Sequence, residues 1–180
     1  MRKLILTISL FTVILLSVNG QSDIAFNSVP IVNGKVVFEY FILTEAGVTP
    51  EQGYAKLQKW VRSKYRGNQM VSGIRFDDKG RFVTVSAKTD FDNLTTMNYR
   101  LDTSVTGAGF MIVIRDITYQ RRADESSFFP KVVTAEQTIT DQAVNSGGGD
   151  DKKFRDGVRS ATLSFLNEIY SEINLLLNQQ

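Results

Sequence analysis

The sequence predicts an α+β domain of two layers, in which a curved antiparallel sheet packs against a short helix and a long C-terminal helix. Strands fill the middle of the chain, and the elements follow the order strand, helix, four strands, helix. A helical pattern runs from Asp151 to Leu177, and at about 1.5 Å per residue this helix would be roughly 40 Å long. The apolar residues that recur at steps of three and four in it are Phe154, Val158, Ala161, Phe165, Ile169, Ile173 and Leu176, with Leu166, Tyr170 and Leu177 beside them.

The first twenty residues predict a secretory signal peptide. Arg2 and Lys3 precede an apolar run from Leu4 to Val18 that is short for a membrane span, and we expect cleavage before Gln21. An uncleaved membrane anchor is the alternative, whereas a lipid anchor is excluded because no cysteine follows the run. We therefore expect an exported protein, periplasmic or extracellular, with one domain over residues 21–180 and no further membrane span.

Charge and missing residue types exclude several functions. The 180 residues include 21 Lys and Arg against 19 Asp and Glu, and loss of Arg2 and Lys3 with the signal peptide leaves 19 against 19. A neutral, exported chain is not expected to bind nucleic acid, which requires an excess of positive charge. His and Cys are both absent, which excludes His general bases, thiol nucleophiles, disulfides and Cys/His metal sites. We expect no metal and no cofactor.

The first strands follow an irregular arm, residues 21–32, that we expect to end in a short edge strand at 29–32. Asn33 and Gly34 favour a two-residue hairpin turn. The first main strand is predicted from Lys35 to Leu43. Because both of its faces are largely apolar, we expect it inside the sheet and not at an edge.

The first helix begins with a capping box. Thr49 is a natural N-cap, Pro50 suits the first helical position, Gln52 completes the box, and Gly67 suits the left-handed position after the last turn. The predicted buried stripe is Tyr54, Leu57, Val61 and Tyr65, with Trp60 alongside. A set of basic residues predicts either a solvated face or contact with an anionic surface; they are Lys56, Lys59, Arg62, Lys64 and Arg66.

Two hairpins complete the sheet. Strands at 70–76 and 81–88 are joined by a turn in which Gly80 is expected to supply a positive φ. Longer strands at 95–105 and 110–120 follow. A turn at Gly107 and Ala108 predicts the pairs Val105–Phe110, Thr103–Ile112, Leu101–Ile114 and Tyr99–Asp116 on the face toward the C-terminal helix, and Asn98–Ile117, Arg100–Arg115, Asp102–Val113 and Ser104–Met111 on the other.

Residues 121–150 are expected to contain a flexible connector. Phe128 to Val133 favours either an extra strand or a docked loop, and the glycine-rich stretch 145–151 favours a flexible link. Asp150 or Asp151 is expected to cap the final helix and to complement its dipole.

Several of these features together resemble a known family. They are the strand that begins at Lys35, then Gly47, the helix that carries Leu57 and Trp60, the hairpins and the terminal helix. They resemble exported bacterial proteins grouped as a domain of unknown function with a TBP-like fold, of β-α-β4-α order. The resemblance covers about residues 29–120 and the last helix, and it implies the fold and the signal peptide. It implies no activity or catalytic residue, and a fold shared with the TATA-binding protein does not imply DNA binding.

The pair formed by Arg100 and Arg115 marks a candidate binding site. Like charges directly opposite each other destabilise a sheet, so a neighbouring group is expected to offset them. One explanation is structural, with Asp102 as a diagonal neighbour or with both side chains in water. The other is an anionic ligand, because Arg forks bind carboxylate, sulfate or phosphate, and Asn98 would add a neutral hydrogen bond. The apolar residues that flank the pair are Met111, Val113 and Ile117.

The remaining patterns do not predict catalysis. Residues 90–93 (Asp-Phe-Asp-Asn) lack the later glycine and glutamate of a calcium loop, and the glycines at 147–149 lack the Gly-Lys-Ser/Thr ending of a phosphate loop. We expect a non-enzymatic binding module of the periplasm or cell envelope, whose partner is an envelope protein, a peptide or an anionic glycan. A structural accessory protein is a further reading. The enzyme alternative is a hydrolase of envelope glycan or peptide that uses carboxylates or a Ser/Lys pair, for which two facing carboxylates in a cleft would be needed.

Overall fold

The computed structural model describes residues 24–44, 47–67, 70–92, 95–121 and 131–177. The predicted signal peptide, residues 1–20, lies outside this part of the chain. Among the helices of the described ranges, none combines the length and the apolar character that a membrane crossing requires.

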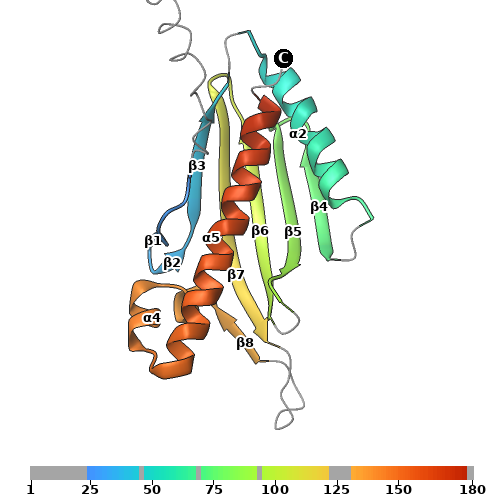
Figure 1. The fold of residues 1–180 in the computed structure, drawn as a ribbon. Helices are drawn as coiled ribbons and strands as arrows, with labels where there is room; N and C mark the ends of the chain where they lie inside the picture. The colour runs from blue at the N-terminus through green and yellow to red at the C-terminus, as the bar shows by residue number, and fades with distance from the viewer. Residues whose placement is uncertain (1–23, 45–46, 68–69, 93–94, 122–130, 178–180) are drawn as a thin grey trace, which may run out of the picture.

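Five antiparallel strands form the main sheet in the order β3-β7-β6-β5-β4, and β8 pairs with the far end of β7. These strands are β3 (Phe38–Leu43), β4 (Val71–Asp77), β5 (Phe82–Asp90), β6 (Thr95–Val105), β7 (Gly109–Arg121) and β8 (Lys131–Thr134). Two helices, α2 (Pro50–Tyr65) and α5 (Gly149–Leu177), lie side by side on one face of the sheet (Figure 1). The predicted two-layer α+β fold is confirmed.

The N-terminal hairpin forms as predicted. Strands β1 (Ile31–Val32) and β2 (Lys35–Val36) pair as a separate two-stranded sheet. Asn33 and Gly34 take positive φ values of 51° and 77°, as a tight two-residue turn requires.

The predicted place of the first main strand inside the sheet is wrong. The stretch from Lys35 to Leu43 divides into β2 and β3, and β3 is an edge strand of the main sheet. Its buried side carries Phe38 and Ile42, whereas Phe41 and Leu43 are 37% and 71% exposed. The second apolar face of β3 therefore belongs to an apolar outer surface of the sheet, and no second layer covers it among the described residues.

The long hairpin β6–β7 has the predicted register as far as the arginine pair. Arg100 lies opposite Arg115, and the pairs between these residues and the turn match the prediction. Beyond them the register shifts by one residue, because Asp116, with φ 55°, forms a bulge. Asn98 consequently pairs with Thr118 and not with Ile117, and Ile117 is buried in the core instead of flanking the pair on the other face.

The shorter hairpin β4–β5 also forms, but its turn differs from the expectation. Arg81, and not Gly80, takes the positive φ, at 49°. The side chain of Asp77 accepts a hydrogen bond from the Gly80 N–H at 3.0 Å. A side chain at position 80 would place its Cβ 2.8 Å from that carboxylate, so the glycine is favoured by a close approach.

Helix α2 has the predicted caps. The Thr49 hydroxyl accepts from the backbone N–H of Gln52 at 3.2 Å, and the Gln52 side chain accepts from the N–H of Thr49 at 2.9 Å. Gly67 follows the last turn with φ 70°. The predicted stripe is buried against the sheet, and its members are Tyr54, Leu57, Val61 and Tyr65.

Helix α5 buries a stripe that is rotated slightly from the predicted one. Its buried residues are Val158, Thr162, Leu166, Ile169, Tyr170, Ile173 and Leu177. Thr162 lies in the middle of this stripe because its hydroxyl bonds to the Val158 carbonyl and to the Tyr119 hydroxyl, at 2.7 and 2.9 Å. A pattern that counts only apolar residues misses such a position. Asp150 and Asp151 lie inside the first turn, where they complement the helix dipole without being the N-cap.

Much of the expected connector at 121–150 is regular structure. After β8 come α3 (Ala135–Thr138) and α4 (Asp141–Ser146), and α5 begins at Gly149. The stretch 145–151 ends α4 and begins α5, and only residues 147 and 148 lie between the two helices. Val132 and Val133 belong to the extra strand that was one of the two expectations, whereas residues 128–130 lie outside the described ranges.

One cluster of buried side chains joins the two layers. At its centre, Phe110, Ile112 and Ile114 of β7 are fully buried, as are Leu166 and Ile169 of α5. The N-terminal arm joins the same cluster through a side chain of α5. The amide of Asn167 accepts from the N–H of Phe26 at 2.9 Å and donates to the carbonyl of Phe26 at 2.8 Å.

Candidate functional site

The arginine pair on the sheet is organised by one buried carboxylate. Asp102 accepts a hydrogen bond from Arg100 Nε at 3.0 Å on one oxygen and from Arg115 Nε at 2.8 Å on the other. The hydroxyl of Thr84, on the next strand, donates to the first oxygen at 2.8 Å. The structure thus brings together three of the four predicted site residues, Arg100, Arg115 and Asp102.

Arg100, Arg115 and Asp102, which we call the arginine triad, differ in exposure and in charge. The Asp102 side chain is 6% exposed, whereas those of Arg100 and Arg115 are 38% and 41% exposed. Burial by itself raises the pKa of the Asp102 carboxyl, but hydrogen bonds from Thr84, Arg115 and Arg100 outweigh it, and the pKa lies below its ordinary value. Two cations and one anion leave a net positive charge at the surface of the sheet.

The terminal nitrogens of both guanidinium groups remain available to a ligand. Each arginine contacts Asp102 through Nε, and within the described ranges neither makes another hydrogen bond or ion pair. Because the carboxylate fixes both side chains, their Nη atoms are held in place at the surface before any ligand arrives.

Asn98 is not part of this triad. Its side-chain amide donates to the Thr118 hydroxyl at 3.3 Å, on the far side of the β7 bulge. The shift in register at Asp116 sets this pair. Asn98 still lies two residues from Arg100 on the same face of β6.

The face that carries the triad is opposite to the one covered by α2 and α5, and it has an apolar half. Toward the β6–β7 turn, the partly or fully exposed apolar side chains on this face are Phe41, Leu43, Phe82, Met111 and Val113. We call this surface the open sheet face. The described part of the 121–150 segment packs beside α5 and at the end of β7, and leaves this face uncovered.

A hollow of about 310 Å³ adjoins the triad at the edge of β7, in the gap between β3 and β8. Arg115 and Asp116 line it from β7, Lys35 lines it from β2, and Glu136 lines it from α3. Glu136 accepts a hydrogen bond from the backbone N–H of Val36 at 2.9 Å. Burial opposes the ionised form of Glu136, but this bond and its neighbours lower its pKa nonetheless.

Three carboxylates of the sheet and its loops make structural hydrogen bonds. Asp102 is occupied on both oxygens, and Asp92 accepts from the backbone N–H of Thr95 at 2.6 Å within the hairpin loop. Asp90 accepts from the Thr96 hydroxyl at 2.6 Å. Among the described residues, no group of three acidic side chains is arranged to hold a metal ion.

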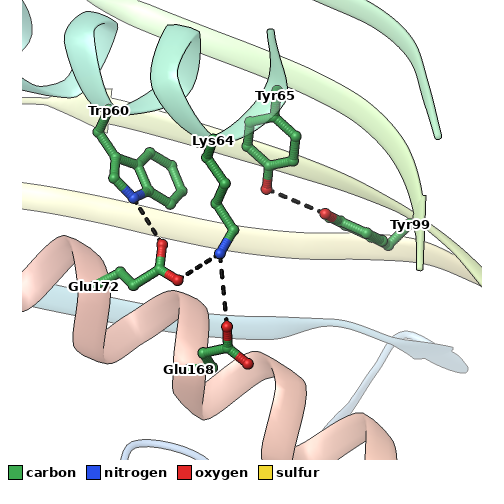
Figure 2. A network of polar contacts seen from close by, with 6 residues as sticks. All are labelled: Trp60, Lys64, Tyr65, Tyr99, Glu168 and Glu172. Atoms are coloured by element: carbon green, nitrogen blue, oxygen red, sulfur yellow. Dashed lines mark hydrogen bonds and ion pairs between the residues drawn. The ribbon is translucent and has the colours of Figure 1, made fainter. Parts of the chain in front are cut away.

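A second polar network, which the sequence did not reveal, joins the two helices. Glu172 of α5 accepts from Trp60 Nε1 at 2.9 Å and from Lys64 Nζ at 2.5 Å, and Lys64 also lies 3.9 Å from Glu168 (Figure 2). Trp60, predicted alongside the buried stripe of α2, also anchors α2 to α5 through its ring N–H. Part of the basic face of α2 therefore makes contacts within the protein. The sequence offers one sign of this network, the i, i+4 spacing of Glu168 and Glu172. Nothing in the sequence shows, however, that these two residues lie opposite α2.

Two tyrosines lie beside this network. The hydroxyls of Tyr65 and Tyr99 are 3.1 Å apart in the core beneath the helices (Figure 2). Burial raises the pKa of Tyr99 to about 12 and raises that of Tyr65 as well. Both hydroxyls therefore stay neutral and serve as mutual hydrogen-bond partners.

Solved structures with the same fold support this architecture. A TBP-like protein from Parabacteroides distasonis superposes with a TM-score of 0.69 and 20% identity, over 84% of this chain and 99% of that chain. A DUF4468 family protein from Bacteroides ovatus gives a TM-score of 0.67 and 19% identity, over 87% of this chain and 94% of that chain. No family model and no curated protein matches the sequence. The resemblance drawn from the sequence is confirmed at the level of the fold, and the chain has a TBP-like α+β fold.

Proposed function

We propose that the protein is an exported, non-enzymatic binding module whose open sheet face docks a partner through an anionic group held by Arg100 and Arg115. The observation that carries this proposal is the single buried carboxylate that fixes both arginines. A pair of like charges held side by side, on a sheet face that the described residues leave uncovered, is costly unless an anion completes it. Asp102 supplies half of that compensation, and a bound anion would supply the rest.

The shape and charge of the face favour an envelope protein, a peptide or an anionic glycan as the partner. Held guanidinium groups recognise the planar oxygens of a carboxylate or the tetrahedral oxygens of a sulfate. The apolar half, which includes Phe41 and Leu43, adds contact area next to the charged half. The formally neutral mature chain, with 19 basic and 19 acidic residues after removal of residues 1–20, speaks against a nucleic acid.

The binding proposal is tested with a double variant, Arg100→Lys/Arg115→Lys. Lysine keeps the positive charge but loses the planar fork, so we expect affinity for the natural partner to fall about tenfold or more, since the fork makes paired charge-assisted hydrogen bonds. The measurement is surface plasmon resonance of the chain from Gln21 against panels of envelope glycans and acidic peptides. The matched control is Lys59→Gln/Arg66→Gln, which removes two exposed cations from the region of α2.

Equal binding by the parent chain, the lysine variant and the control would place the partner elsewhere. A loss confined to the control would move the site to the basic face of α2. Binding that responds only to total charge, at low salt, would contradict recognition by the fork.

Export is tested separately by the mass of the mature protein. Expressed with its own first twenty residues in a bacterial host, the protein is expected in the periplasmic or extracellular fraction with residues 1–20 removed. Intact mass spectrometry measures this directly. A full-length mass in the cytoplasmic fraction would contradict export, and a full-length mass in the membrane fraction would indicate the uncleaved anchor.

A further inference from the structure

Two neighbouring cavities lie on the helix-covered side of the sheet, away from the open sheet face. The first, which we call the basic cavity, has a volume of about 110 Å³ and lies between the ends of β6, β7 and β8 and the start of α5. The second, the apolar cavity, measures about 330 Å³ and lies along the first turns of α5. Thr95 and Phe154 line both of them, so the two cavities meet at these side chains.

The basic cavity has an excess of positive charge. Arg121, Lys131 and Arg155 line it together with one carboxylate, Asp151, which gives three cations against one anion. Asp151 is already paired with Arg155 at 2.9 Å. Arg121 lies over the ring of Phe154, 4.8 Å from its centroid, and neither Arg121 nor Lys131 makes an ion pair within the described ranges. Because these two cations have no acidic partner in the described ranges, they favour an anionic ligand.

A buried hydroxyl without a partner lies at the same place. Thr95 is 2% exposed, and its Oγ1 makes no hydrogen bond within the described part of the chain. The residue is held in place because its backbone N–H donates to Asp92 at 2.6 Å. Unsatisfied buried hydroxyls are rare in native structures, since each loses its hydrogen bonds to water without replacement. A ligand oxygen at the junction of the cavities would satisfy this one.

The apolar cavity offers a surface of the opposite character. Phe91, Phe154, Val158 and Ala161 line it, and the polar groups at its border, Asp92 and Lys153, are engaged with Thr95 and Asp150. Gly157 lies at its margin, and a Cβ placed there would have no atom within 4 Å. Apolar cavities of roughly 150 Å³ accept a benzene ring, so this one has room for a short aliphatic chain.

We propose that the two cavities form one binding site for a small amphiphilic carboxylate. The carboxylate lies in the basic cavity, where Arg121 and Lys131 bind it and the Thr95 hydroxyl donates to it. The aliphatic chain extends over Phe154 into the apolar cavity. This site is independent of the arginine triad, and its failure or success leaves the proposed function of the open sheet face untouched.

The test uses isothermal titration calorimetry with three probes of one chain length, octanoate, 1-octanol and octylammonium, below their micelle concentrations. We expect octanoate to bind most tightly, octanol more weakly and octylammonium not at all. Shortening the acid to hexanoate and butyrate is expected to weaken binding about two- to fourfold per methylene removed. Equal binding of octanoate and octylammonium would overturn the proposal, as would the absence of octanoate binding.

Three variants separate the parts of the site. Arg121→Gln/Lys131→Gln is expected to weaken octanoate binding at least tenfold and to leave octanol binding unchanged. Gly157→Leu fills the apolar cavity from a position with free space, and leucine favours a helix more than glycine does, so the fold is kept while octanoate binding is lost. Unchanged octanoate binding in either variant would overturn the assignment of that cavity.

Thr95→Val tests whether the hydroxyl serves the ligand, because it is expected to change stability and octanoate affinity in opposite directions. Valine has the shape of threonine without the hydroxyl, so it removes the unsatisfied group. We expect the melting temperature of the free protein to rise and the affinity for octanoate to fall about tenfold or more, the worth of one hydrogen bond to a charged group. A rise in melting temperature with unchanged octanoate affinity would show that the hydroxyl does not serve the ligand.

Discussion

Replacing Gly109 by alanine is expected to lower the free energy of unfolding by about 3 kcal/mol, at the upper end of the cost of overpacking. Gly109 begins β7 and lies opposite Leu43 of the edge strand β3. A Cβ at this position would lie 2.1 Å from the backbone oxygen of Ile42 and 3.0 Å from the ring of Phe41. The oxygen belongs to the strand ladder and cannot move aside as a side chain would, so the end of β3 must separate from β7.

The matched control for this experiment is Gly107→Ala, in the same turn. A Cβ on Gly107 would have no atom within 4 Å, and we expect a change of less than about 0.5 kcal/mol there, as for an ordinary surface substitution. Urea unfolding followed by circular dichroism measures both variants. Similar losses at the two positions would show that the turn as a whole, and not the approach of Ile42, sets the requirement for glycine.

Asp102→Asn is expected to lower the free energy of unfolding by about 2–3 kcal/mol. The amide has nearly the size of the carboxylate, but it presents an NH₂ group where one arginine now donates. It also removes the negative charge that offsets the repulsion between Arg100 and Arg115. The loss should stay below that of a fully buried ion pair, because both arginines are more than a third exposed and can be hydrated. Asp141→Asn is the control, since Asp141 pairs with Arg159 but its side chain is 81% exposed; we expect a loss of about 0–1 kcal/mol there.

The stabilisation by Asp102 is also expected to depend on pH. The pKa of its carboxyl is lower in the folded protein than in the unfolded chain, where it is about 3.9. The contribution is therefore complete above the unfolded pKa and is lost as the pH falls toward the folded pKa. Urea unfolding of the parent chain and of Asp102→Asn between pH 7 and pH 3 measures this, and the difference in stability should shrink below about pH 4. A difference that stays constant over this range would contradict a role for the charge.

Local signals in the sequence predicted the parts of the fold that depend on a few adjacent residues. The capping box of α2 needs only Thr49 and Gln52, and the first hairpin turn needs only Asn33 and Gly34. The pairing of Arg100 with Arg115 follows from counting outward from one turn. These features hold because backbone geometry within a few residues determines them.

The features that the sequence did not reveal depend on residues far apart in the chain. The edge position of β3 depends on which strand pairs with β7, and both faces of an edge strand can be apolar when one of them lies on the open sheet face. The bulge at Asp116 is a non-glycine residue with a positive φ, which no local pattern marks. The bond from Glu172 to Trp60 spans 112 positions, so neither residue alone indicates it.

The candidate site was predicted in part. The two explanations offered for the arginine pair, a neighbouring carboxylate and an anionic ligand, were alternatives at the level of the sequence. In the structure the first is realised by Asp102, and the same contacts leave the Nη atoms of both arginines without a partner among the described residues. The predicted pairing of Asn98 with Ile117 is wrong because the register was extended across the bulge without a shift.

The hydrogen bonds between Phe26 and Asn167 have a consequence for folding during synthesis on the ribosome. They join residues 141 positions apart, and α5 is the last described element to be made. Until α5 emerges, α2 covers only part of the helix-covered face of the sheet, and the side chains that pack against α5 stay exposed to water. A nascent chain of this kind cannot complete its core while synthesis continues, so it remains unfolded and aggregation-prone for longer than a protein whose contacts are local.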